Sequence, residues 1–326
     1  MTKENIEKQN NIEHITYSTA MDLVKKEIYI ALSTAPILIR KYTEHLMTSS
    51  GKNIRAIALI TCAENEDGFI HPHAIKFAAA IELLHLATLV HDDVIDNANI
   101  RRGDLTLQKK YGKRTAVICG DYLFCMALKL AAAISNKEDY LKLDMPDYMS
   151  RVCLGELNQH VNSGFLDLSV YQYLKIISGK TAALFEASFY AGAILSENDK
   201  LAMRKYMRLG RYIGMIFQMA DDCMDFETTE NIAKKPVQSD FEQGVVTLPL
   251  IYAFKNMIGF KEKAKNNQLS RNDINAAVAK TGGLSFTRMV SKKYYDKALI
   301  IINELKITET KRIKLISILD KASGLS

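Results

Sequence analysis

Residues 72–96, PHAIKFAAAIELLHLATLVHDDVID, are apolar almost throughout and end in three aspartates. Pro72 favours the first turn of a helix, where its missing N–H is not needed. A long stretch with apolar side chains on every side is typical of a helix buried inside a bundle. The stretch therefore predicts a central buried helix with Asp92, Asp93 and Asp96 at its C-terminal end.

Other long stretches have the same character and predict an all-α chain. Only five prolines occur, and no alternating strand pattern persists. Further helices are predicted within residues 113–135, 145–161, 169–195 and 198–226, and shorter amphipathic ones follow Leu248. Ser196 with Asp199 matches a capping box, which predicts that a helix starts there. We expect one helical domain over residues 1–326 with a polar N-terminal tail at residues 1–15.

The polar stretch ETTENIAKKPVQSDFEQGVV, residues 227–246, interrupts this pattern. It predicts a long loop directly after a second group of aspartates. Long loops inside compact domains are often functional lids. We interpret residues 227–246 as an active-site loop, with an ordinary solvated connection as the alternative.

The second aspartate group lies in FQMADDCMDF, residues 217–226, and repeats the spacing of the first. Positions i and i+4 share one face of a helix, so Asp92 projects with Asp96 and Asp221 projects with Asp225. Carboxylate oxygens are the ligands that Mg²⁺ prefers, and it completes its shell with water and substrate phosphates. Two such groups predict a clamp that holds a diphosphate through several Mg²⁺ ions.

Three other interpretations of the acids fit less well. One copy of the pattern alone would suit solvated acids at a helix end. The alternating ligands and central glycine of a calcium-binding EF-hand are absent. A di-iron bundle needs Glu-x-x-His pairs, and the sequence contains none.

Basic residues precede and follow the two acidic groups along the sequence. Arginine forks and lysine charges both suit phosphate oxygens. The candidates are Lys52 and Arg55, Arg101 and Arg102, Lys180 beside Thr181, and Lys234 and Lys235. The stretch SGKT, residues 178–181, is not a nucleotide-binding P-loop, because the first glycine of that motif is absent and no strand precedes it.

The composition excludes several classes of protein. The net charge of +6 is too small to argue for nucleic acid binding. No run of about 18 apolar residues predicts a membrane-spanning helix, and the polar N-terminus lacks the apolar core of a secretory signal. The five cysteines form no C-x-x-C pair, which suits free thiols in a reducing cytoplasm. We therefore expect a cytoplasmic protein.

With these motifs the chain resembles the trans-polyprenyl diphosphate synthase family over roughly residues 20–325. The stretches that carry the resemblance are GKNIR (51–55), ELLHLATLVHDDVIDNANIRRG (82–103), GDYLF (120–124), GELNQ (155–159), GKTAALF (179–185), FQMADDCMD (217–225) and KKP with SDFEQGVVTLPL (234–236 and 239–250). The resemblance implies the isoprenoid synthase fold, a single all-α domain of antiparallel helices around a central cavity. It is strongest to the large, catalytic component of bacterial hexaprenyl and heptaprenyl diphosphate synthases.

The resemblance implies a role for each matching residue. Asp92, Asp96, Asp221 and Asp225 would bind Mg²⁺, with Asp93 and Asp222 assisting. Lys52, Arg55, His85 and Arg102 would hold the diphosphate of isopentenyl diphosphate. Arg101, Lys180, Thr181, Gln218 and Lys235 would contact the allylic diphosphate. Small or aliphatic residues before Asp92, namely Ala87, Thr88 and Leu84, would leave a tunnel open for a long product.

The implied reaction begins with ionisation of an allylic diphosphate, for which the resemblance implies farnesyl diphosphate. It continues with attack by isopentenyl diphosphate and loss of a proton. Repeated condensation would give an all-trans product such as hexaprenyl or heptaprenyl diphosphate for a menaquinone side chain. The family's GGKxxRP reads SGKNIRA at residues 50–56, and its GKPxGxD reads KKPVQSD at residues 234–240. These departures do not touch the six aspartates.

The resemblance also implies partners and alternatives. A small non-catalytic component would complete a heterodimer, with a homodimer as the alternative, and transient membrane contact would assist product release. The alternative functions are those of a homo-oligomeric octaprenyl-type or geranylgeranyl synthase, a terpene cyclase, or a silent regulatory subunit. The two intact aspartate groups and the surrounding cations argue against the last two.

Overall fold

A computed structural model of the chain describes residues 14–48, 53–101, 103–134, 147–197, 199–227, 241, 244–266 and 268–324. Its helices are α2 (Tyr17–Ser33), α3 (Ile37–Thr48), α4 (Ile54–Cys62), α5 (His73–Ile95), α6 (Leu107–Tyr111), α7 (Lys113–Ala132), α9 (Tyr148–Val161), α10 (Val170–Lys180), α11 (Ala182–Ser196), α12 (Lys200–Glu227), α13 (Leu248–Asn256), α14 (Phe260–Lys265), α15 (Arg271–Thr281), α16 (Gly283–Glu304) and α17 (Glu309–Ser323). The short strands β1 (Ile100–Arg101) and β2 (Asp104–Leu105) pair antiparallel. The helical fold predicted from the sequence is confirmed.

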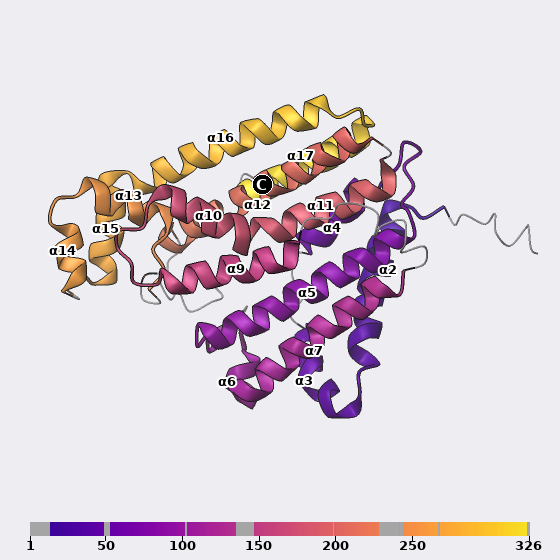
Figure 1. Ribbon diagram of the computed structural model, residues 1–326, viewed down its shortest axis with the longest axis horizontal. Coiled ribbons are helices and arrows are strands. Elements are labelled where there is room, and N and C mark those ends of the chain that lie inside the picture. The colour runs from indigo at the N-terminus through magenta and orange to yellow at the C-terminus, as the bar shows by residue number, and fades with distance from the viewer. Residues whose placement is uncertain are drawn as a thin grey trace, which may run out of the picture.

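Helix α5 runs through the bundle, as its apolar pattern predicts (Figure 1). It packs against α7, α2, α4 and α11. Ala78, Leu83 and Val90 are buried on it. By length and composition alone α5 and α7 could each cross a membrane, but a core helix passes the same test. The two helices pack against each other in the bundle.

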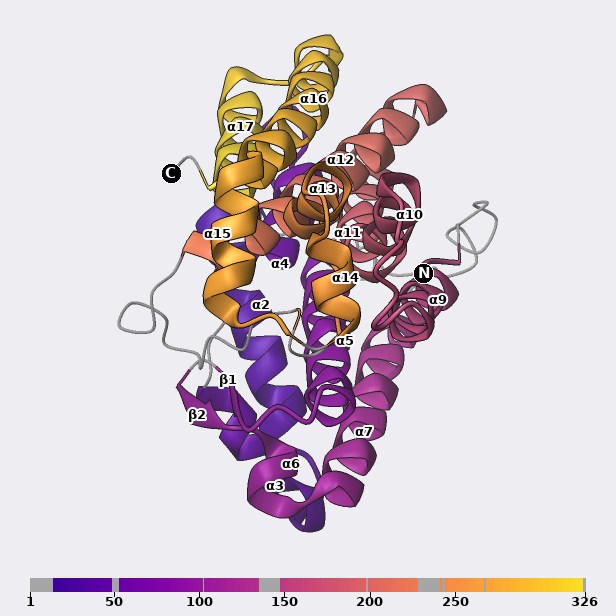
Figure 2. The ribbon, with the colours of Figure 1, turned by 90° about the vertical axis from the view of Figure 1, so that its left-hand side faces the viewer.

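The C-terminal ends of α5 and α12 point towards the same end of the molecule, on the left of Figure 1. Helices α10 and α11 follow one another between them in sequence, and α10 contacts both α9 and α12. Figure 2 views the molecule from that end, where the hairpin of β1 and β2 also lies. This arrangement brings the two aspartate-bearing helix ends to one side of the bundle.

A close crossing of two helices positions α9 against α10. A Cβ atom on Gly155 of α9 would lie 2.1 Å from the backbone nitrogen of Lys180, and one on Gly179 would lie 2.8 Å from the carbonyl oxygen of Arg151. No side chain fits in either place, because real Cβ atoms do not approach other atoms this closely. The two glycines therefore let the backbones of α9 and α10 touch.

The start of α12 differs from the capping box predicted at Ser196 and Asp199. Asp199 alone caps the helix, since its carboxylate accepts hydrogen bonds from the backbone N–H groups of Leu201 at 2.9 Å and Ala202 at 3.3 Å. The hydroxyl of Ser196 instead donates to the carbonyl oxygen of Cys62 at 2.6 Å. A tertiary contact that the local sequence does not show has taken one of the two partners.

The C-terminal helix is held against the end of α4 by a buried lysine. The Lys311 side chain, on a residue only 3% exposed, donates to the carbonyl oxygens of Cys62 at 2.9 Å and Glu64 at 2.7 Å. Lys314 forms an ion pair with the Glu64 carboxylate at 2.7 Å. Leu315 and Leu319 of α17 are fully buried, so polar and apolar contacts together attach this helix.

Candidate active site

The first aspartate group lies at the C-terminal end of α5. Asp92 and Asp96 are half-buried on one face of the helix. Burial is the main reason that the pKa of Asp92 is raised to about 7, with Lys180 and Arg101 opposing the shift and Glu156 and Asp96 adding to it. Burial likewise raises the pKa of Asp96. Carboxylates held in this way repel one another and attract a cation.

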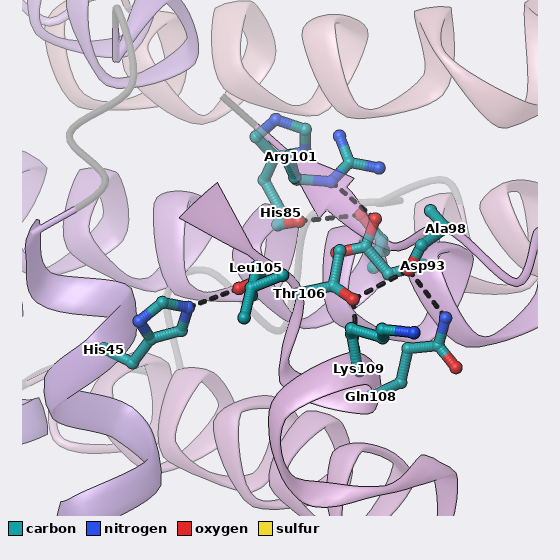
Figure 3. Close-up of polar contacts among 10 residues, drawn as sticks. His45, His85, Asp93, Ala98, Arg101, Leu105, Thr106, Gln108 and Lys109 are labelled. Carbon is teal, nitrogen blue, oxygen red and sulfur yellow. Dashed lines mark hydrogen bonds and ion pairs between the residues drawn. The ribbon is translucent and has the colours of Figure 1, made fainter. Parts of the chain in front are cut away.

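Asp93 points to a different neighbour. It is 6% exposed, and its carboxylate forms an ion pair with Nε of Arg101 at 2.7 Å (Figure 3). Arg101 lies on β1, directly after the helix. The pair fixes the hairpin to the end of α5 and holds an arginine beside the first aspartate group.

Lys180 completes this group from the end of α10. Its ammonium lies 2.8 Å from the Glu156 carboxylate of α9. Burial acts to lower the pKa of Lys180, but the charges of Asp92, Glu156 and Asp96 outweigh it and the pKa is raised. The lysine therefore remains charged where it can meet a diphosphate. Glu156 was not predicted as a site residue, although it lies in the stretch GELNQ. The close approach of its neighbour Gly155 to the backbone of Lys180 brings Glu156 to this lysine.

The second aspartate group lies near the C-terminal end of α12 and is held differently. Asp222 is 3% exposed and accepts hydrogen bonds from the Tyr173 hydroxyl at 2.5 Å and the Gln218 amide at 2.8 Å. The Gln218 side-chain oxygen accepts in turn from the Thr181 hydroxyl at 2.6 Å. Burial raises the pKa of Asp222, and these hydrogen bonds oppose the rise. Tyr173 was likewise not predicted as a site residue from the sequence.

Two adjacent residues, Lys180 and Thr181, interact with the two aspartate groups. Lys180 acts on Asp92 and Asp96, and Thr181 reaches Asp222 through Gln218. Residue Thr181 is the point where α10 ends and α11 begins. Asp221 is exposed and Asp225 is half-buried, so these two are placed to act outside the buried network. The junction of α10 and α11 thus connects both aspartate groups.

The acids suit a hard divalent cation by their chemistry. The carboxylates of each group supply oxygen ligands. Around the first group, the acids Asp92, Asp93, Asp96 and Glu156 outnumber the cations Lys180 and Arg101. Within the described ranges, no three His, Cys, Asp or Glu side chains converge tightly enough to hold a metal by themselves. A partial shell of this kind fits Mg²⁺, which takes one or two carboxylates and completes its coordination with water and phosphate oxygens.

The predicted isopentenyl diphosphate residues are only partly described. Arg55 is 7% exposed in the first turn of α4, and its guanidinium lies 4.6 Å from the centre of the Phe185 ring. His85 is half-buried on α5, and its carbonyl oxygen accepts a hydrogen bond from the Thr88 hydroxyl at 2.8 Å. Lys52, Arg102, Lys234, Lys235 and most of the predicted loop at 227–246 lie outside the described residues.

The predicted chain-length residues face two directions. Ala87 is 1% exposed and packs in a cluster with residues of α2 and α7. Thr88 and Leu84 are half-buried. On a helical wheel Thr88 lies about 40° from Asp92, whereas Ala87 lies about 100° from Thr88 and about 140° from Asp92. The two adjacent residues therefore meet different surroundings.

Comparisons with known proteins give a consistent result. The sequence pattern of the family described as polyprenyl synthetase matches residues 36–281. The chain is 33% identical over 291 residues to heptaprenyl diphosphate synthase component 2 of Bacillus subtilis (strain 168), covering 87% of this chain and 82% of the relative.

Solved structures agree with the sequence comparison. A heptaprenyl diphosphate synthase from Staphylococcus aureus superposes with a TM-score of 0.85 at 31% identity, over 95% of this chain and 99% of that one. A polyprenyl synthase from Caulobacter crescentus CB15, complexed with calcium and isoprenyl diphosphate, has a TM-score of 0.83 at 29% identity, over 94% of each chain. The fold is the isoprenoid synthase fold.

Proposed function

We propose, since this chain belongs to the polyprenyl synthetase family and is a trans-polyprenyl diphosphate synthase, that it extends farnesyl diphosphate to a hexaprenyl or heptaprenyl product. The observation that carries the site assignment is the junction of α10 and α11. Lys180 there serves one aspartate group and Thr181 is linked to the other. The similarity to a heptaprenyl synthase component supports the product length.

Mg²⁺ ions, when bound, would neutralise the diphosphate that leaves the allylic substrate. Asp92, Asp96, Asp221 and Asp225 are the residues that we assign to hold them. The relative crystallised with calcium and isoprenyl diphosphate supports divalent-metal dependence in this family.

The charged side chains of the chain assist the same step. Arg101 is fixed against Asp93 and Lys180 against Glu156, so both cations are ordered before substrate arrives. Preorganised charges stabilise a developing anion at little further cost. Asp222 is held by Tyr173 and Gln218, and we assign it the role of fixing the end of α12. The proton lost at the end would go to the departing pyrophosphate.

An apolar surface on α7 and α9 supports a second subunit. Ile118 and Leu128 of α7 and Leu154, Leu157 and Val161 of α9 are each more than half exposed. Both helices lie on the face towards the viewer in Figure 1. Large apolar side chains gathered on exposed helix faces are typical of a protein interface. We propose that a small non-catalytic component covers it, with a second copy of this chain as the alternative.

The decisive experiment incubates the purified chain with Mg²⁺, isopentenyl diphosphate and farnesyl diphosphate, with and without the small component. Chromatography of the dephosphorylated products gives their length. A product of 30 or 35 carbons that needs the small component supports both parts of the proposal. A long product at full rate from the chain alone contradicts the heteromer, and a cyclic or absent product under both conditions contradicts the activity. Cytoplasmic location and a menaquinone destination belong to this same proposal.

A further inference from the structure

The two-stranded hairpin that carries Arg101 depends on contacts from outside it. Strands β1 and β2 have two residues each, and so short a pair is not stable alone in water. Arg101 joins β1 to Asp93 of α5. At the base of the hairpin, the Thr106 hydroxyl and the Gln108 amide both donate to the carbonyl oxygen of Ala98, at 2.7 and 2.6 Å (Figure 3). These contacts hold the first strand and the base.

The second strand is held by a different helix. His45, in the last turn of α3, lies with Nε2 2.6 Å from the carbonyl oxygen of Leu105 (Figure 3). A carbonyl oxygen only accepts, so Nε2 carries the hydrogen and donates it. Leu105 pairs with Ile100, and the adjacent pair in the register is Arg101 with Asp104. The imidazole therefore acts one residue pair away from the arginine.

A second contact joins α3 to the segment that follows the hairpin. The rings of Tyr42 on α3 and Tyr111 on α6 meet edge to face with their centres 4.9 Å apart. Helix α6 begins immediately after the hairpin, and its N-terminal cap is the same Thr106 that bonds to Ala98. The Tyr pair brings α3 close to α6, and the His45 hydrogen bond then fixes the strand.

We propose that His45 is a positioning residue for diphosphate binding, acting by holding the arginine-bearing hairpin against α3. The inference rests on the proposed function, because Arg101 is assigned there to the substrate diphosphate. When the hydrogen bond is lost, the hairpin must be ordered at the moment of binding. That ordering weakens binding more than it slows the chemical step, so KM should rise while kcat stays nearly constant.

The test compares His45→Ala with His45→Gln, whose side-chain amide can still donate. KM for each of the two diphosphate substrates and kcat are measured with Mg²⁺ present. We expect His45→Ala to raise KM for at least one substrate about three- to tenfold, the effect of losing one hydrogen bond, with kcat within about twofold. His45→Gln should restore most of the binding. His45→Leu fills the same space without a donor and replaces the alanine variant if that variant does not fold.

Two further measurements make the result independent of turnover. Hydrogen exchange in the hairpin, residues 98–108, should be faster in His45→Ala than in the wild type and near normal in His45→Gln. Calorimetric titration with inorganic pyrophosphate and Mg²⁺ should show weaker binding in the alanine variant. These two arms still decide the role of His45 if the wild type proves inactive, an outcome that would overturn only the proposed function.

His160 offers a matched control, since it also lies in the last turn of a helix, α9, and is exposed. His160→Ala should change neither KM nor hairpin exchange. Unchanged KM values and pyrophosphate binding in His45→Ala would overturn the proposal. The proposal would also be overturned if KM rose as much in His45→Gln as in His45→Ala. Loss of the donated hydrogen bond would then not be the cause of the rise.

Discussion

At the scale of single residues, the aspartates are placed for binding at a cost to stability. The raised pKa of Asp92, about 7, shows that its charged form is disfavoured in the metal-free protein. Asp92→Asn removes that charge and keeps the shape of the side chain. We expect at least about a hundredfold loss of turnover, as for removal of a principal transition-state contact, with thermal stability equal to or above that of the wild type.

The control for this substitution is Asp67→Ala, an exposed acid in the turn after α4. It should leave turnover and melting temperature unchanged. Turnover is measured with Mg²⁺ and both diphosphates, and melting by circular dichroism. Full activity in Asp92→Asn would contradict the metal assignment, and unfolding would show that Asp92 supports the fold instead.

The residues of the site were predictable only where local spacing reveals them. The aspartates appear because i and i+4 share a helix face, and their position at the ends of apolar helices shows in the sequence. Glu156 and Tyr173 do not appear, because each acts across a helix crossing, to Lys180 and to Asp222. Ala87 and Thr88 point in different directions because successive helix residues are rotated by about 100°, but which of them meets the core depends on the packing of α7.

At the scale of helices, the crossing of α9 and α10 is a sensitive point. Alanine normally stabilises a helix interior by about 1 kcal/mol relative to glycine. Gly155→Ala should do the opposite, because its Cβ would lie 2.1 Å from the Lys180 backbone nitrogen. Overpacking of this kind costs about 1–3 kcal/mol. Urea unfolding measures the change, and turnover should fall as Lys180 moves.

Cys153→Ala, an exposed change on the same helix, is the control for this crossing and should be neutral. A more stable Gly155→Ala variant would show that α9 and α10 can separate without loss.

A second prediction at this scale concerns α5, because the faces that carry Thr88 and Ala87 have different surroundings. Thr88→Phe adds an aromatic ring on the side of Asp92 and should shorten the product towards farnesyl or geranylgeranyl diphosphate. Ala87→Phe places the ring in the cluster with α2 and α7, where it should cost about 1–3 kcal/mol of stability. Chromatography of dephosphorylated products and urea unfolding separate the two effects. An unchanged product from Thr88→Phe would show that the growing chain follows another route.

At the scale of the whole molecule, the apolar surface of α7 and α9 should control assembly. Leu157 is 55% exposed, and Leu157→Asp would place a charge in the proposed interface. A buried unpaired charge disfavours association by several kcal/mol. We expect light scattering to show loss of the complex with the small component, or of the homodimer, while the circular dichroism spectrum is unchanged. Tyr171→Asp, on the exposed side of α10, is the control.

The overall architecture was the most predictable property of the chain. Apolar residues on all sides of residues 72–96 indicate a buried helix whatever its neighbours are, and α5 lies within the bundle. Contacts between distant parts were not predictable in the same way. The Ser196 hydroxyl looked like a helix cap in the sequence, but it bonds to the carbonyl oxygen of Cys62, and no local pattern distinguishes the two.

The attachment of Lys311 to the end of α4 has a consequence for biosynthesis. The Lys311 ammonium and the Glu64 carbonyl that it binds are 247 residues apart in the sequence. A ribosome adding about 5–20 residues per second needs roughly 12 to 50 seconds to cover that distance. Throughout that time the nascent N-terminal helices lack the segment that satisfies the end of α4. Chaperones that shield apolar surfaces therefore have a long interval in which to act on this chain. A ribosome that stops before the codon for Lys311 would leave a product without the contacts that this lysine makes at the end of α4.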